Sequence, residues 1–142
     1  MRVMSTDTRT GPVMTVAFPG GKRVSASYKG FTVETDQPEK AGGDGSAPAP
    51  FDLFMASLAT CAGIYVLGFC QKRGIATDGI RVVQRLGRDA DGRIETVAIG
   101  IEVPPDFPEK YHGALQRVAA KCAVKMTIEE PPQFTIETVV AS

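Results

Sequence analysis

The chain of 142 residues carries sixteen basic and sixteen acidic side chains, so its formal net charge is zero. Hydrophobic residues make up 43% and charged residues 23%, a balance typical of a soluble globular protein. Because no segment concentrates positive charge, the composition argues against nucleic-acid binding. We expect one domain over residues 1–142, with a polar, flexible start at residues 1–11, no signal peptide and cytoplasmic localisation.

Three short strands are predicted first, at residues 13–18, 23–28 and 31–35, separated by turns that contain glycine. Their alternating apolar and polar side chains are typical of an antiparallel meander with one buried face. The segment 36–50 follows and contains three prolines and three glycines, so we expect a loop. Loops of this length inside a small domain are usually functional or disordered.

A long helix is predicted from about Phe51 to Lys72, with Asp52 in its first turn and Gly74 as its C-terminal cap. Its side chains are apolar on almost every side, but it is rich in small residues and ends in charged ones. It is therefore predicted to be a core helix, not a membrane span. One three-stranded sheet covers only one side of such a helix, so we expect an obligate dimer with this helix near the interface.

The rest of the chain is predicted to add a hairpin, a helix and a last strand. The hairpin joins strands at 80–86 and 94–103 through a turn at 89–92, the helix runs from Pro108 to about Val124, and the strand covers 134–140. The order βββ-α-ββ-α-β contains no βαβ repeat. The fold class is therefore α+β, with antiparallel sheets around a long buried helix.

Two sequence stretches resemble the OsmC/Ohr family, which comprises osmotically inducible protein C and organic hydroperoxide resistance proteins. The first is GGDGSAPAPFDLFMASLATCAG at residues 42–63, a Gly-Gly loop leading into a Pro-started helix that carries Cys61. The second is AAKCAV at residues 119–124, which carries Cys122. The likeness covers most of the chain from Gly30 onward. It implies an OsmC-like fold and an intertwined homodimer with two active sites at the subunit interface.

The resemblance also implies a function, a thiol-dependent peroxidase that reduces organic hydroperoxides. Cys61 corresponds to the reactive cysteine, whose thiolate becomes a sulfenic acid, and Cys122 to its resolving partner. A thiol or dithiol then reduces the disulfide, and in Ohr-like relatives this reductant is a lipoyl-bearing protein. No cofactor and no metal ion are expected.

The thiolate needs a cation, which the family supplies as an arginine from the N-terminal strands, held by a glutamate on the central helix. Arg23 is our candidate for this arginine, and an exposed strand charge is its equally plausible alternative role. The family's glutamate position is Phe51 here, and Asp52, the nearest acid, is our candidate for that site residue. Nine residues before Cys61, Asp52 is expected on the opposite side of the helix, where it stabilises the helix dipole. A further departure is Ala123, where relatives often have proline.

Other readings stay open at this point. Cys70 and His112 are expected to be a packed core residue and a surface residue, respectively. A zinc site formed by Cys61, Cys122 and His112 would need a fourth ligand and lacks ligand-like spacing. The main alternative function is a non-catalytic OsmC-like dimer that binds a small apolar or thiol ligand, or senses oxidation. The missing acid at position 51 favours that alternative.

Overall fold

The structure is a computed structural model, and it describes residues 13–141. The chain divides into two compact units, Met1–Phe54 and Met55–Ser142, each of which is described by itself. The expected flexible start at residues 1–11 lies outside the described residues. The single domain over residues 1–142 stays a prediction.

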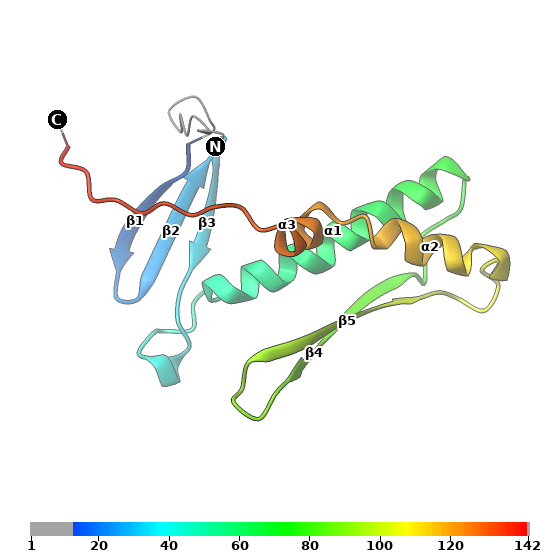
Figure 1. Cartoon of the computed structure of the whole chain (residues 1–142), viewed down its shortest axis with the longest axis horizontal. Coiled ribbons are helices and arrows are strands. Elements are labelled where there is room, and N and C mark those ends of the chain that lie inside the picture. Colours follow the sequence, from blue (N-terminus) through cyan, green and yellow to red (C-terminus); the bar gives the residue numbers. More distant parts are fainter. Residues whose placement is uncertain (1–12, 142) are drawn as a thin grey trace, which may run out of the picture. The chain divides into compact units, whose positions relative to one another are not determined.

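The first unit contains a three-stranded antiparallel sheet, seen in blue and cyan in Figure 1. Its strands are β1 (Thr15–Gly20), β2 (Arg23–Tyr28) and β3 (Phe31–Thr35), in the order β1-β2-β3. The central strand pairs its Ala26 with Val16 on one side and with Val33 on the other. The antiparallel meander expected from the sequence is confirmed, and β2 and β3 have the predicted bounds. The expected buried face is not seen, because the apolar side chains of Val16 and Phe31 are exposed.

The loop after β3 is organised around the buried carboxylate of Asp36. This carboxylate accepts hydrogen bonds from the backbone N–H groups of Gln37, Asp44 and Ser46, and from the Ser46 hydroxyl at 2.6 Å. The Ser46 hydroxyl, followed by the backbone donors, lowers the pKa of Asp36 to about 2. The loop, which includes the short helix η2 (Glu39–Ala41), is therefore an ordered structure and not a disordered linker.

The position of Gly43 in this loop admits no other residue without rearrangement. A side chain there would collide with the Gln37 carbonyl and would lie 2.8 Å from the Asp36 carboxylate. The glycine therefore allows the loop backbone to fold closely over Asp36.

The long helix α1 (Pro50–Lys72) begins one residue earlier than expected and ends at the predicted residue. The Asp52 carboxylate accepts a hydrogen bond from the backbone N–H of Ala49 at 3.0 Å, which ties the helix start to the residue before it. At the other end, Gly74 has a φ of +64°, as a C-terminal cap requires. By length and composition α1 could also span a membrane, but its residues Val66, Phe69 and Cys70 belong to the core described next.

The second unit builds its core from α1, a hairpin and α2. The hairpin consists of β4 (Arg81–Arg88) and β5 (Ile94–Glu102), which pair antiparallel, and α2 spans His112–Ala119 after the short helix η3 (Glu109–Tyr111). The hairpin runs along α1, and α2 lies beside the same helix (Figure 1). The fully buried members of this core are Val66, Phe69, Cys70, Phe107 and Leu115.

Two predictions for the C-terminal third were wrong. The expected helix over 108–124 is broken: α2 ends at Ala119, Cys122 has an extended ψ of 121°, and a separate helix, α3 (Ala123–Glu129), follows. The expected strand over 134–140 is absent, since residues 131–141 form no regular structure and the Ile136 side chain is 97% exposed. A strand needs a hydrogen-bonded neighbour, and within the described residues none pairs with this segment.

Candidate active site

Within the second unit, the break between α2 and α3 brings Cys122 to Cys61. Cys61 lies on α1 and is partly buried, whereas Cys122 is the N-cap residue of α3 and only 1% exposed. The two thiols interact through a side-chain hydrogen bond. Cys122 is also anchored to α1, because its thiol donates to the Leu58 carbonyl over 3.9 Å. All three cysteines of the chain are free thiols.

The surroundings change the pKa values of the two thiols in opposite directions. Hydrogen bonding from the backbone N–H of Val124, then from the Cys122 thiol, lowers the pKa of Cys61, although burial opposes this change. Burial, followed by the hydrogen bond with Cys61, raises the pKa of Cys122. The negative charge of the pair therefore resides on Cys61, while Cys122 keeps its proton.

The start of α3 supplies the donors for both sulfur atoms. The N–H of Lys125 donates to the Cys122 sulfur at 3.5 Å, and the N–H groups of Ala123 and Val124 act on Cys61. The first N–H groups of a helix have no partner within the helix, so they are available to a nearby anion. The sequence analysis did not predict these backbone donors. The one sign of them is Ala123, which has an N–H where relatives often have proline.

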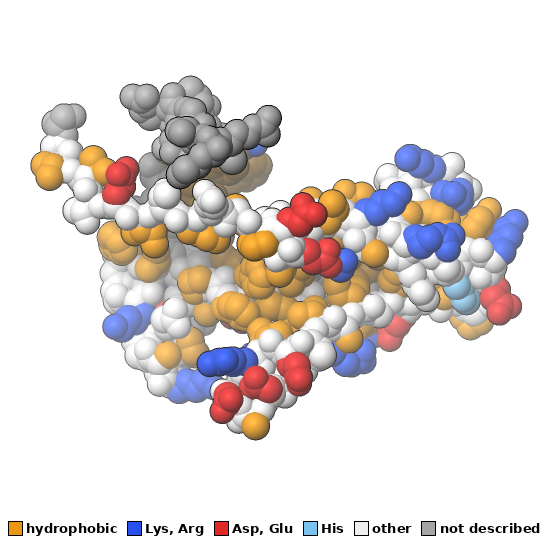
Figure 2. Space-filling view, viewed as in Figure 1, with side chains coloured by type: hydrophobic (Ala, Val, Ile, Leu, Met, Phe, Trp, Pro, Cys, Tyr) orange, Lys and Arg blue, Asp and Glu red, His pale blue; other side chains and the backbone are white. Residues whose placement is uncertain are grey.

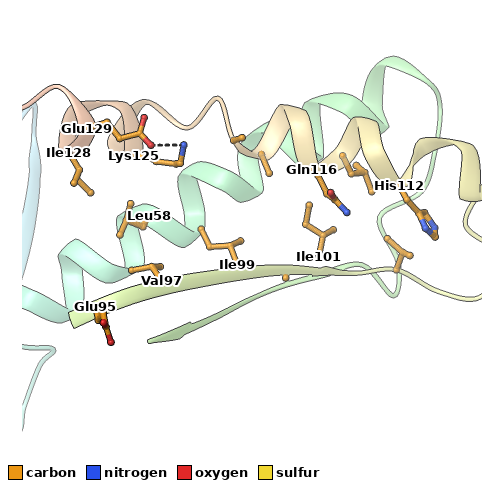
Figure 3. A pocket seen from close by; sticks show the side chains of 15 residues that line it. Leu58, Glu95, Val97, Ile99, Ile101, His112, Gln116, Lys125, Ile128 and Glu129 are labelled. Atoms are coloured by element: carbon orange, nitrogen blue, oxygen red, sulfur yellow. Dashed lines mark ion pairs between the residues drawn. The ribbon is translucent and has the colours of Figure 1, made fainter. Parts of the chain in front are cut away.

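The second unit contains a trough of about 950 Å³, whose lining includes neither Cys61 nor Cys122. Its wall includes Leu58 and Lys125, whose backbone atoms contact the Cys122 sulfur. Figure 3 shows β5 forming the floor with Val97, Ile99 and Ile101 pointing inward, and α2 and α3 above. The lining is mainly aliphatic, and Figure 2 shows hydrophobic side chains gathered in this hollow between the hairpin and α3.

The few polar groups of the trough lie towards its two ends. Lys125 and Glu129 form an ion pair at 2.8 Å on α3, and His112 and Gln116 line the opposite end on α2 (Figure 3). The trough therefore offers an apolar surface that includes two residues in contact with Cys122, with no unpaired cation of its own among the described lining residues.

The other two predicted site residues, Arg23 and Asp52, belong to the first unit, whereas the cysteine pair belongs to the second. Arg23 is exposed at the start of β2 and makes no ion pair with any described residue. It belongs to the first unit and Cys61 to the second, so its role as the activating cation stays a prediction. Asp52 contacts the backbone of Ala49 at the start of α1, which fits the expected helix-stabilising role better than a role in the site.

Cys70 and His112 are located as the sequence predicted. Cys70 is fully buried in the core of the second unit, where burial raises the pKa of its thiol. His112 is exposed at the start of α2, and its ring stacks on Phe107 with centroids 5.9 Å apart. Among residues 13–141, no group of three His, Cys, Asp or Glu side chains could hold a metal ion.

These features define an α+β domain in which a perturbed cysteine on a central helix meets a buried cysteine at the start of a later helix. The family model described as OsmC-like protein matches residues 43–137, well over half of the chain. The chain therefore belongs to the OsmC-like protein family. No protein of curated function matches it.

Solved structures share the same fold. A candidate osmotic stress induced and detoxification response protein from Psychrobacter arcticus 273-4 is 26% identical, with a TM-score of 0.67 over 80% of this chain and 85% of that one. An organic hydroperoxide resistance protein OsmC from Legionella pneumophila is 17% identical, with a TM-score of 0.54 over 83% and 88%. A candidate organic hydroperoxide resistance protein from Vibrio cholerae, with captopril bound in one of its active sites, is 18% identical, with a TM-score of 0.51 over 92% of both chains.

Proposed function

We propose that the protein is a thiol-dependent peroxidase that reduces organic hydroperoxides. The observation that carries this proposal is the interacting pair of Cys61 and Cys122, in which the pKa of the first thiol is lowered and that of the second is raised. A peroxide-reducing pair needs one thiolate to attack and one thiol held in reserve. The name of the Legionella pneumophila relative supports the same substrate class.

The reaction consumes one hydroperoxide and two thiols. The Cys61 thiolate attacks the terminal peroxide oxygen, the O–O bond breaks, and the leaving alkoxide takes a proton and departs as the alcohol. Cys61 is then a sulfenic acid. The Cys122 sulfur attacks the Cys61 sulfur, an S–S bond forms, and the hydroxyl leaves with the Cys122 proton as water. An external thiol or dithiol returns two electrons by thiol–disulfide exchange and restores both thiols.

The trough favours organic hydroperoxides over hydrogen peroxide as substrates. Its aliphatic wall would gain from covering an apolar group, which hydrogen peroxide lacks. The trough also reaches the backbone groups that contact Cys122, so an apolar group held there would lie near the reactive sulfur atoms. We further propose that Arg23 adds positive charge at the thiolate, and that the protein works in the reducing cytosol.

A second function is favoured by two separate observations. The family's acid position is occupied by Phe51, and the Vibrio cholerae relative holds captopril, a thiol compound, in one of its active sites. Both fit a non-catalytic protein that binds a small apolar or thiol ligand, or that senses oxidation without fast turnover.

Counting thiols after exposure to peroxide distinguishes the two functions. Reduced protein mixed with one equivalent of cumene hydroperoxide should lose two thiols per chain, those of Cys61 and Cys122, because both are consumed in one cycle. Cys70 should stay free because it is buried in the core. Alkylation followed by peptide mass spectrometry measures all three. A slow loss spread evenly over the three cysteines would favour the binding protein.

The assembly that we propose is a homodimer. Two apolar stretches of the second unit are exposed: the Ile64 side chain on α1 is 59% exposed, and the segment 134–140 has a strand pattern but pairs with no described residue. A second copy would bury both. Sedimentation velocity should therefore give twice the chain mass of 15.1 kDa, and Ile64→Glu should lower the dimer fraction at least tenfold at equal concentration. A wild-type monomer at micromolar concentration would contradict this proposal.

A further inference from the structure

The docking of α3 depends on the two reduced sulfur atoms. The N–H of Lys125 donates to the Cys122 sulfur at 3.5 Å, the N–H groups of Val124 and Ala123 lower the pKa of Cys61, and no oxygen-bearing side chain caps the helix. The Cys122 thiol also links the start of α3 to the Leu58 carbonyl on α1. None of the α3 residues is fully buried, so little apolar packing holds the helix apart from these contacts.

Formation of the disulfide removes most of these contacts together. Cys61 loses its negative charge, and a charged acceptor binds N–H groups about twice as strongly as a neutral one. Cys122 loses its single proton, so it can no longer donate to Leu58 or to Cys61, and the two sulfur atoms must approach to bonding distance. The cap of α3 and its link to α1 are therefore weakened in the same step.

A reductant that attacks the disulfide at the Cys122 sulfur needs access that the docked α3 does not give, and this weakening provides it. The Cys122 side chain is only 1% exposed while α3 is docked, and an incoming thiolate must reach a sulfur atom of the disulfide. We propose that α3 is a redox-released cover, which is docked over Cys122 when both cysteines are thiols and is released when they form a disulfide. This inference rests on the proposed function, because the disulfide is the intermediate of that reaction.

Hydrogen exchange tests the cover directly. The disulfide is formed with diamide, a two-electron thiol oxidant that contains no peroxide and is itself reduced to the hydrazine. Backbone amides at 125–129 should then exchange roughly tenfold faster than in the reduced protein, the factor expected for loss of a helix cap. Amides of the β4–β5 hairpin should be unchanged. Equal exchange at 125–129 in the two forms would overturn the inference.

A serine variant provides the matched control. Cys122→Ser cannot form the disulfide, and serine is a preferred N-cap residue, so α3 should exchange slowly with or without diamide. Faster exchange at 125–129 in this variant after diamide treatment would also overturn the inference. The two proposals can fail separately. If diamide forms the disulfide but α3 stays protected from exchange, only the proposed cover is rejected. If the thiols do not react with hydroperoxide, only the proposed peroxidase is rejected. If diamide cannot link Cys61 to Cys122, both are wrong.

Discussion

Replacing Cys61 by serine should abolish the reduction of cumene hydroperoxide, with a fall in rate of at least about a thousandfold. The serine hydroxyl stays protonated at neutral pH, so the nucleophile that the Val124 and Ala123 N–H groups stabilise would be missing. Peroxide consumption with dithiothreitol as reductant measures the effect. We expect the loss to be complete because no other cysteine contacts Cys122 among the described residues.

Cys70→Ala is the matched control for this substitution. Cys70 is nine residues further along the same helix but lies in the core, so its removal should leave the rate within about twofold of wild type. Equal losses in the two variants would mean that Cys61 is not the attacking residue. Circular dichroism before each measurement would ensure that both variants are folded.

Removing the backbone donors of α3 should shift the reactivity of Cys61 to higher pH. In the wild type the lowered pKa of Cys61 gives more thiolate at neutral pH than an ordinary cysteine, whose pKa is about 8.5. Val124→Pro deletes the N–H with the largest effect on this pKa. The pKa should rise, and the alkylation rate at pH 7 should fall roughly tenfold for each unit of the rise. Above pH 10 the wild-type and variant rates should converge.

Ala123→Pro offers a milder version of the same test. Proline is well tolerated at the first position of a helix, and the extended Cys122 before it suits a following proline. The Ala123 N–H has a smaller effect on the pKa of Cys61, so the shift should be smaller than in Val124→Pro. Met126→Ala, an exposed change on the same helix, should leave the profile unchanged. If Val124→Pro matches the wild-type profile, α3 does not activate Cys61.

Regular elements with a strong local pattern could be predicted from the sequence. The alternation in 23–28 and 31–35 identified β2 and β3, and the caps at Pro50 and Gly74 bounded α1. The helix break at Cys122 could not be predicted, because Ala119, Ala120 and Lys121 all favour a helix. There the contact of Cys122 with Cys61 and Leu58 outweighs local preference.

In the candidate site, too, some features could be predicted from the sequence and others could not. The pairing of Cys61 and Cys122 was expected only from the family resemblance, since sixty residues of separation carry no local signal. Backbone N–H groups such as that of Val124 are present in every residue except proline, so nothing in the sequence marks them as functional. Asp36 was missed for a similar reason, because its donors come from a loop whose shape the sequence does not reveal.

The buried Asp36 carboxylate affects how the loop at residues 36–50 responds to pH. With a pKa of about 2, against 3.8 when unperturbed, Asp36 contributes stability that is present above pH 4 and fades only as the pH falls towards 2. At neutral pH the Asp36 carboxylate in the loop before α1 therefore stays ionised. Changes of activity between pH 6 and pH 9 would therefore not come from protonation of Asp36 or from loss of the hydrogen bonds that it accepts in this loop.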